Sequence, residues 1–166
     1  MKTYQDVAEG MKAGMRRLAK GVTVITLRDL AGQRYAMTAS AVTSLSDSPA
    51  SLLICANKTS SLAPHFVKAT PFCVNVLSHN MELLSNRCAG KEKGEARFDV
   101  GDWVDHESTQ LPFINNAEAV FFCVSDDVKK YGTHLIVIGK IVEVKVATTE
   151  VNPLIYVDGG YRQLKM

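Results

Sequence analysis

Apolar residues change their period after about the first twenty positions of the chain. Val7, Met11, Met15 and Leu18 recur at helical spacing, which predicts one amphipathic helix over about residues 3–20. From Val22 onward, short β-branched and aromatic runs replace this pattern, and turns rich in Gly, Asn and Asp separate them. The predicted strands lie in 22–28, 34–46 (a strand and its exit), 51–56, 72–77, 118–128, 133–146 and 153–157. Between them we expect short helices at 60–69 and 80–90 and a charged surface loop at 91–103.

Many strands and few helices, without regular alternation, argue against a doubly wound parallel sheet. A closed antiparallel barrel fits better, because closure removes exposed strand edges. The chain contains neither G-x-G-x-x-G nor G-x-x-x-x-G-K-[ST], so a nucleotide would have to be held by another design. No repeat or linker divides the sequence, and we expect one domain over 1–166, with an N-terminal helix in 1–20 and the barrel in 22–164.

Charge and composition exclude several classes of protein. The formal net charge is only +2, which does not suggest nucleic-acid binding. No apolar run approaches the roughly 20 residues of a membrane helix, and the first residues lack the apolar block of a signal peptide, so a cytoplasmic protein is expected. The four Cys and four His are scattered without metal-ligand spacing, and we therefore expect no metal site.

Two neighbouring segments have the residue types that a flat, phosphorylated ligand needs. Residues 37–46 (MTASAVTSLS) combine small side chains with hydroxyls, so a ring can approach the backbone closely. Residues 55–61 (CANKTSS) run from a strand end into a predicted helix start, where free N–H groups attract phosphate. A half-solvated strand and an ordinary Ser-capped helix are the alternatives.

Three later segments carry further candidates. Arg97 is suited to pair with a phosphate and Phe98 to pack on a ring, although a solvated charged loop is the better explanation of this segment taken alone. His134 begins a long apolar strand, where it either hydrogen-bonds a substrate or serves the structure. The segment 156–162 (YVDGGYR) offers aromatic faces and an Arg for a nicotinamide, or an edge that seals a dimer.

The order of these segments is more specific than any one of them. GVTVIT, MTASAVTSLSDSPASLLICANKTSS, FCVNVL, ARF, GTHLIVIGKI and PLIYVDGGYRQL together resemble the flavin reductase-like family, over about residues 7–164. Members of this family are small reductase components of two-component flavin-dependent monooxygenases, such as 4-hydroxyphenylacetate 3-monooxygenase. The resemblance implies a mainly β fold, a split β-barrel of the antiparallel Greek-key, FMN-binding type with a few short flanking helices, and a homodimer.

The resemblance also implies the roles of particular residues. The flavin, FMN or FAD, would be bound by Thr38, Ala39, Ser40, Ala41, Ser44, Cys55, Ala56, Asn57, Lys58, Ser60, Ser61, Cys88, Ala89, Gly90, Arg97 and Phe98. The nicotinamide of NADH or NADPH would lie near His134, Tyr156, Gly159, Tyr161 and Arg162, with His134 as the catalytic residue. This chain has Gly-Thr-His where many members have Gly-Asp-His.

The expected function is NAD(P)H-dependent reduction of free flavin by hydride transfer, with the reduced flavin diffusing to a partner monooxygenase. Because hydride transfer is the chemistry of the cofactors themselves, the protein needs no nucleophile or acid–base pair and has only to position the two rings. Three alternatives remain at this stage: a flavoprotein that reduces ferric iron or another acceptor, a non-catalytic flavin-binding protein, and a purely structural barrel.

Overall fold

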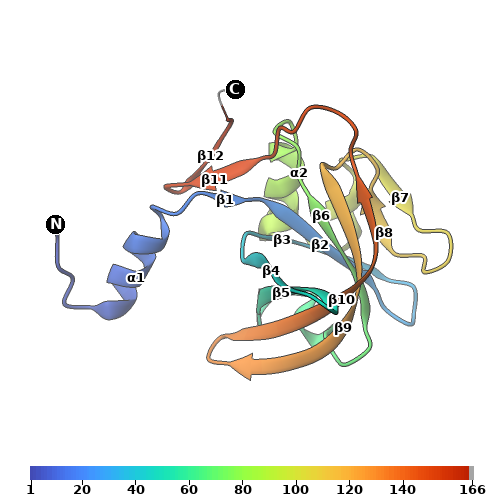
Figure 1. Ribbon diagram of the computed structural model, residues 1–166, viewed down its shortest axis with the longest axis horizontal. Coiled ribbons are helices and arrows are strands. Elements are labelled where there is room, and N and C mark those ends of the chain that lie inside the picture. Colours follow the sequence, from blue (N-terminus) through green and yellow to red (C-terminus); the bar gives the residue numbers. More distant parts are fainter. Residues whose placement is uncertain (165–166) are drawn as a thin grey trace.

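The computed structural model describes residues 1–164, so the last two residues assigned to the domain above lie outside the described part (Figure 1). Its elements in chain order are α1 (Val7–Met15), β1 (Lys20–Gly21), β2 (Thr23–Arg28), β3 (Arg34–Ala39), β4 (Val42–Asp47), β5 (Ala50–Asn57), the 3₁₀ turn η1 (Ala63–His65), β6 (Pro71–Val76), α2 (Glu82–Asn86), the π-type turn η2 (Arg87–Lys91), the 3₁₀ helix η3 (Gly94–Phe98), β7 (Trp103–Asp105), β8 (Pro112–Ile114), β9 (Ala119–Tyr131), β10 (His134–Val146), β11 (Ile155–Val157) and β12 (Gly160–Arg162).

Seven strands form one curled sheet in the order β3-β2-β6-β9-β10-β5-β4, and every ladder in it is antiparallel. The expected mainly β, split-barrel class is confirmed. Within residues 1–164 no ladder joins β3 to β4, so the sheet remains open between these consecutive strands, which Ser40 and Ala41 connect. The opening exposes backbone and small side chains at the end of β3, where the sequence predicts a ligand.

Strands β2 and β6 and the first half of β9 are buried on both faces. Alternate residues of β2 belong to different clusters, with Val24 in one and Ile25 in the other. The same alternation separates Cys73 from Phe72 in β6. Strands covered on both faces become nearly continuous apolar runs, which explains the sequences around FCVNV and VFFCV.

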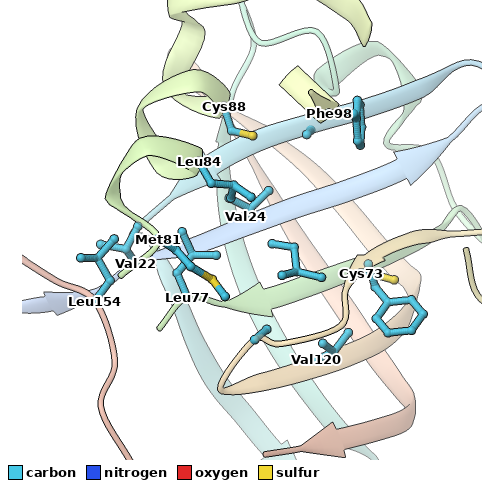
Figure 2. Close-up of a cluster of buried hydrophobic side chains, with 14 of the residues drawn as sticks. Val22, Val24, Cys73, Leu77, Met81, Leu84, Cys88, Phe98, Val120 and Leu154 are labelled. Carbon is cyan, nitrogen blue, oxygen red and sulfur yellow. The ribbon is translucent and has the colours of Figure 1, made fainter. Parts of the chain in front are cut away.

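Figure 2 shows the cluster between β2 and the helical segment α2–η2, where Leu84 and Cys88 lie beside Val24. The second cluster fills the barrel interior and is covered by Leu62 and Phe66 around η1. These two cores fix the position of β2 and hence, through the β2–β3 ladder, of the open end of β3.

Helix α1 is shorter than the predicted 3–20. Asp6 caps its start, accepting hydrogen bonds from the backbone N–H groups of Ala8 and Glu9 at 2.7 and 3.2 Å. The glycines at 10 and 14 weaken the helix, and the chain from Lys20 pairs instead with β11. Helix α1 extends away from the barrel and has no buried residue (Figure 1).

Two other local predictions were wrong. The expected helix at 60–69 is only the single turn η1, which has no side-chain cap, because the chain turns back into β6 at Pro71. The expected loop at 91–103 contains η3, which is held against β3 by the ion pair between Arg34 and Glu95. Glu95 has a pKa below its ordinary value because the Arg34 side chain hydrogen-bonds to its carboxylate.

Candidate active site at the open end of strand β3

A cavity of about 360 Å³ lies where the end of β3 meets the β11–β12 hairpin and the turn after α2. Its size is within the usual range of small-molecule sites. Seven of the residues proposed from the sequence line it, and they come from both the flavin group and the nicotinamide group: Thr38, Ala39, Ser40, Ala89, Tyr156, Gly159 and Tyr161. The sequence analysis did not include its other lining residues, Val22, Asn86 and Gly160.

Buried Ser85 of α2 connects the two walls of this cavity. Its carbonyl oxygen accepts a hydrogen bond of 2.6 Å from the Thr38 hydroxyl on β3. Its own hydroxyl lies 2.8 Å from the phenol oxygen of Tyr161 on β12. The Tyr161 ring in turn packs edge-on against Tyr156, with ring centroids 5.3 Å apart. The aromatic wall is therefore held in a fixed position relative to the small-residue strand.

A larger cavity, about 690 Å³, lies on the other side of Ser40. Ser40, Ala41, Ser44 and Cys55 from the proposed flavin group line it. The backbone N–H of Cys55 donates to the carbonyl of Ala41 at 3.0 Å, which joins the end of β5 to the β3–β4 connection. Ser40 therefore faces both cavities and lies at the centre of the candidate site.

The proposed phosphate loop after β5 is organised by Asn57 rather than by a helix start. The Asn57 side-chain oxygen accepts from the backbone N–H and the hydroxyl of Thr59, both at 3.0 Å. A three-residue η1 does not supply the helix-end field that the sequence analysis expected. The Ser60 hydroxyl, however, is buried and has no hydrogen-bond partner within residues 1–164. An unsatisfied buried hydroxyl fits a polar ligand group in this loop.

The side chains of Arg97 and Phe98, which the sequence suggested for a phosphate and a flat ring, make contacts within the protein itself. The Arg97 guanidinium donates to the carbonyls of Ala36 and Glu92 and to the Ser61 hydroxyl at 2.6, 2.8 and 2.9 Å, so it ties three segments together. The buried Phe98 ring lies under the Arg34 guanidinium and against Trp103, at 4.2 and 4.8 Å. Both residues hold η3 and its neighbours in place but line neither cavity described above, and direct contact with flavin stays a prediction.

The remaining proposed residues divide between two places. His134 is exposed at the start of β10, opposite Asn57 in the β5–β10 ladder, with its Nδ1 2.9 Å from the Thr133 hydroxyl. The Lys58 side chain donates to the Gly132 carbonyl at 2.5 Å nearby, and Ala56 is buried in β5. Gly90 has a φ of 100° and turns the chain out of η2, and Arg162 donates to the Tyr161 carbonyl at 2.7 Å. Within one chain, His134 does not line the cavity that holds Tyr156 and Tyr161.

Three of the four cysteines are buried thiols, and the proposed contact of one of them, Cys88, with flavin stays a prediction. Burial raises the pKa of Cys88 and of Cys123 to about 12, and it raises that of Cys73 further still. Cys55 is only half-buried and lines the larger cavity.

We therefore expect one fast-reacting thiol per native chain toward a disulfide reagent at mildly alkaline pH, since thiolates are the reactive species. All four should react after unfolding. Cys55→Ser should remove the fast phase, and bound flavin should slow it. A fast phase that persists in Cys55→Ser would contradict this assignment.

No group of three or more His, Cys, Asp or Glu in the described part of the chain is arranged to hold a metal ion. Among residues 1–164 no helix is long and apolar enough to cross a membrane.

The open seven-stranded sheet and the hydroxyl-lined cavity at the end of β3 define a small split-barrel β protein. Comparison with known proteins gives the family: the model of the flavin reductase like domain matches residues 15–165. The chain belongs to this flavin reductase-like family.

Proteins of this family are similar to the chain over most of its length. It is 37% identical over 150 residues to the FMN reductase (NADH) RutF of Pantoea ananatis, covering 90% of this chain and 77% of the relative. It is 36% identical over 158 residues to the reductase component of the FADH(2)-dependent resorcinol hydroxylase of Rhizobium sp., covering 95% and 87%. The solved structure of the flavin reductase PheA2 in its native state superposes with a TM-score of 0.83 at 30% identity, covering 98% of this chain and 100% of PheA2.

Proposed function

We infer that this chain is an NADH-dependent flavin reductase that supplies reduced flavin to a separate monooxygenase. The observation that carries this inference is the cavity of about 360 Å³ shared by the small-residue end of β3 and the aromatic β11–β12 hairpin. Two flat rings need such a site, with backbone access on one side and aromatic packing on the other. The relatives named as NADH-dependent FMN reductase and as a hydroxylase reductase component support the same activity.

The bound pair of rings would supply the chemistry, which is hydride transfer from the dihydronicotinamide to the flavin. In this proposal the hydroxyls of Thr38 and Ser40 and the backbone between them bind the flavin ring edge. The Asn57–Ser61 loop, with its unsatisfied Ser60 hydroxyl, binds the ribityl phosphate of FMN or FAD. Tyr156 and Tyr161 pack on the nicotinamide side, and the protein excludes water between the rings.

The reductase activity is tested by anaerobic oxidation of NADH with added FMN, FAD or riboflavin, followed as loss of the dihydronicotinamide absorbance. Turnover that scales with added flavin is the expected result and ranks the acceptors. Tight flavin binding without turnover for any flavin would overturn the proposal and favour a non-catalytic flavin-binding protein. Turnover that occurs only with a ferric complex would assign a different acceptor.

His134→Ala and Arg162→Ala are expected to leave flavin binding unchanged and to lower NADH turnover, by roughly 10-fold or more, if these residues position the nicotinamide. The measurement is kcat/KM for NADH beside the Kd for FMN from flavin fluorescence. The control is Arg17→Ala, which removes an exposed cation from the α1–β1 connection. Arg28 is unsuitable for this purpose because its guanidinium forms an ion pair with Asp105. Unchanged turnover in both variants would show that the nicotinamide lies elsewhere.

We propose further that two copies of this chain form the working enzyme. The larger cavity is lined mainly by apolar side chains of α1, the segment that follows it, β4, β5, β9 and β10, among them Leu18, Leu53, Phe121 and Ile141. The apolar face of α1 is exposed, with Val7 at 82%. Exposed apolar surface of this kind usually marks an interface. His134 lies apart from Tyr156 within one chain, and a second copy offers a way to bring such groups to one site.

The dimer predicts a solution mass of twice the 18.1 kDa of one chain. Leu18→Glu should shift it toward the monomer, because the new carboxylate would be buried in the contact. Leu30→Glu, the same change on a fully exposed turn between β2 and β3, should leave the mass unchanged. Light scattering after size-exclusion chromatography decides, and a monomeric native protein would refute the dimer.

We also propose that the protein works in the cytoplasm. Its four cysteines are all free thiols, as expected in a reducing compartment.

A further inference from the structure

A third cavity, about 290 Å³, adjoins the candidate active site and is cationic. It shares Ser40, Tyr156 and Gly159 with the cavity assigned above to the rings. Its remaining walls come from α1, the segment that follows α1, and the β11–β12 turn, and they include Lys12, Arg16 and Lys20. Asp158 is the single acidic residue in this lining, so the cavity has an excess of positive charge.

Lys12 and Lys20 are available for a ligand. Neither forms an ion pair within residues 1–164. Lys20 lies directly opposite Tyr156 in the β1–β11 ladder, and Tyr156 lies opposite Tyr161 in the β11–β12 ladder. Residues directly opposite in a ladder point to the same face of the sheet, so one face carries an ammonium group followed by two aromatic rings.

Arg16, in contrast, is engaged in contacts that connect the end of α1 to the β11–β12 hairpin. Its guanidinium approaches the Asp158 carboxylate at 3.7 Å and the Asp158 carbonyl at 3.5 Å. The Arg16 carbonyl accepts a hydrogen bond from the Asp158 N–H at 2.8 Å. Gly159 makes room for this contact, because a Cβ there would come within 2.2 Å of the Arg16 guanidinium. The position of Lys12 relative to Tyr156 is thus set by the fold.

We propose that this cationic cavity, defined by Lys12, Arg16 and Lys20, binds the pyrophosphate of the NADH co-substrate while the nicotinamide occupies the adjoining ring cavity. Lysine ammonium groups bind phosphate oxygens, and a cleft lined by one sign of charge concentrates the opposite sign. The proposal rests on the reductase function above and adds which part of this chain selects a dinucleotide donor.

FAD also contains a pyrophosphate, so the test separates the two sources by varying donor and acceptor independently. The variant is Lys12→Ala/Lys20→Ala, which removes two exposed or half-exposed charges and leaves the Arg16 contacts in place. Lys68→Ala, an exposed lysine between η1 and β6, is the matched control. With riboflavin as acceptor, only NADH contains phosphate; with 1-benzyl-1,4-dihydronicotinamide as donor and FAD as acceptor, only FAD does.

In the riboflavin assay we expect KM for NADH to rise about 10-fold in the double variant, with kcat nearly unchanged, since each lost charge-assisted contact weakens uniform binding. The wild-type KM for NADH should also rise with salt, more steeply than that of the variant. KM for the benzyl donor should be the same in both proteins.

Two results would overturn the proposal while the wild type still reduces flavin. One is an unchanged KM for NADH in the double variant. The other is a higher KM for FAD with the benzyl donor and no change for NADH, which would assign the pyrophosphate to the flavin. A wild type that oxidises neither donor with any flavin would instead refute the reductase function itself.

Discussion

Ser40→Trp is expected to weaken FMN binding roughly 100-fold and to abolish measurable flavin reduction, a loss equivalent to about 3 kcal/mol of steric cost. Ser40 lines the ring cavity, the cationic cavity and the large apolar cavity, and it is the residue that these three have in common. An indole at position 40 would fill space that the flat ligand needs, because the indole enters one of these three cavities whatever its side-chain conformation. Quenching of FMN fluorescence on binding gives the Kd directly.

The control for Ser40→Trp is Ser46→Trp, the same substitution on the exposed outer part of β4. It should retain the wild-type Kd for FMN and the wild-type turnover. Far-UV circular dichroism of both variants checks that the sheet is intact. A Ser40→Trp protein that folds and binds FMN normally would show that the open end of β3 is not the flavin site.

Asn75→Ala is expected to lower the free energy of unfolding by about 3 kcal/mol, because it leaves two buried backbone groups without partners. Asn75 is fully buried in β6, where its amide donates to the Val24 carbonyl and its oxygen accepts from the Ile114 N–H, both at 2.9 Å. Asn75 therefore links the two-stranded sheet of β7 and β8 to β2. Urea unfolding followed by circular dichroism measures the change.

The matched control is Asn116→Ala, which removes an exposed amide just after β8 and should change the free energy of unfolding by less than about 0.5 kcal/mol. If Asn75→Ala is as stable as the wild type, the hydrogen bonds of Asn75 do not hold the sheet of β7 and β8 in place. Activity is a second readout, because the Asn75 contacts lie outside the three cavities.

The sequence was sufficient to predict the longer strands and the class of fold, but not the short strands β1, β7, β8 and β12. Runs such as VTVIT and FCVNV have the β-branched character of strands, and the structure explains why they lack alternation: they are buried on both faces. The sequence could not show that the sheet stays open between β3 and β4, because strand pairing is decided by contacts between residues far apart in the chain.

Helical predictions failed where tertiary contacts outweighed local pattern. The apolar spacing of the first twenty residues continues to Leu18, yet the helix ends at Met15 because Lys20 and Gly21 join β11. The segment 60–69 was predicted as a helix, but only the single turn η1 forms there because the chain continues into β6 at Pro71. The phosphate argument that depended on a helix start there now depends on Asn57 and the Ser60 hydroxyl.

Part of the site was missed although a signal was present. Lys12, Arg16 and Lys20 are spaced four residues apart, which forms a basic stripe at helical period in the first twenty residues. The sequence analysis used that segment only for its apolar face. Ser85 had no comparable signal, since its role comes from bridging Thr38 and Tyr161, which are far from it in sequence.

The burial of three cysteine thiols affects how the protein withstands oxidation in the presence of air. Reduced flavin that escapes into aerobic solution passes its electrons to oxygen and yields hydrogen peroxide, so a reductase of this kind is exposed to an oxidant of its own making. Peroxide attacks thiolates rather than thiols. Burial raises the pKa of Cys88 and of Cys123 to about 12, so both are held as neutral thiols at neutral pH. The buried thiols of Cys73, Cys88 and Cys123 are therefore protected from the by-product of catalysis, whereas half-buried Cys55, which lines the larger cavity, is the thiol that peroxide can reach.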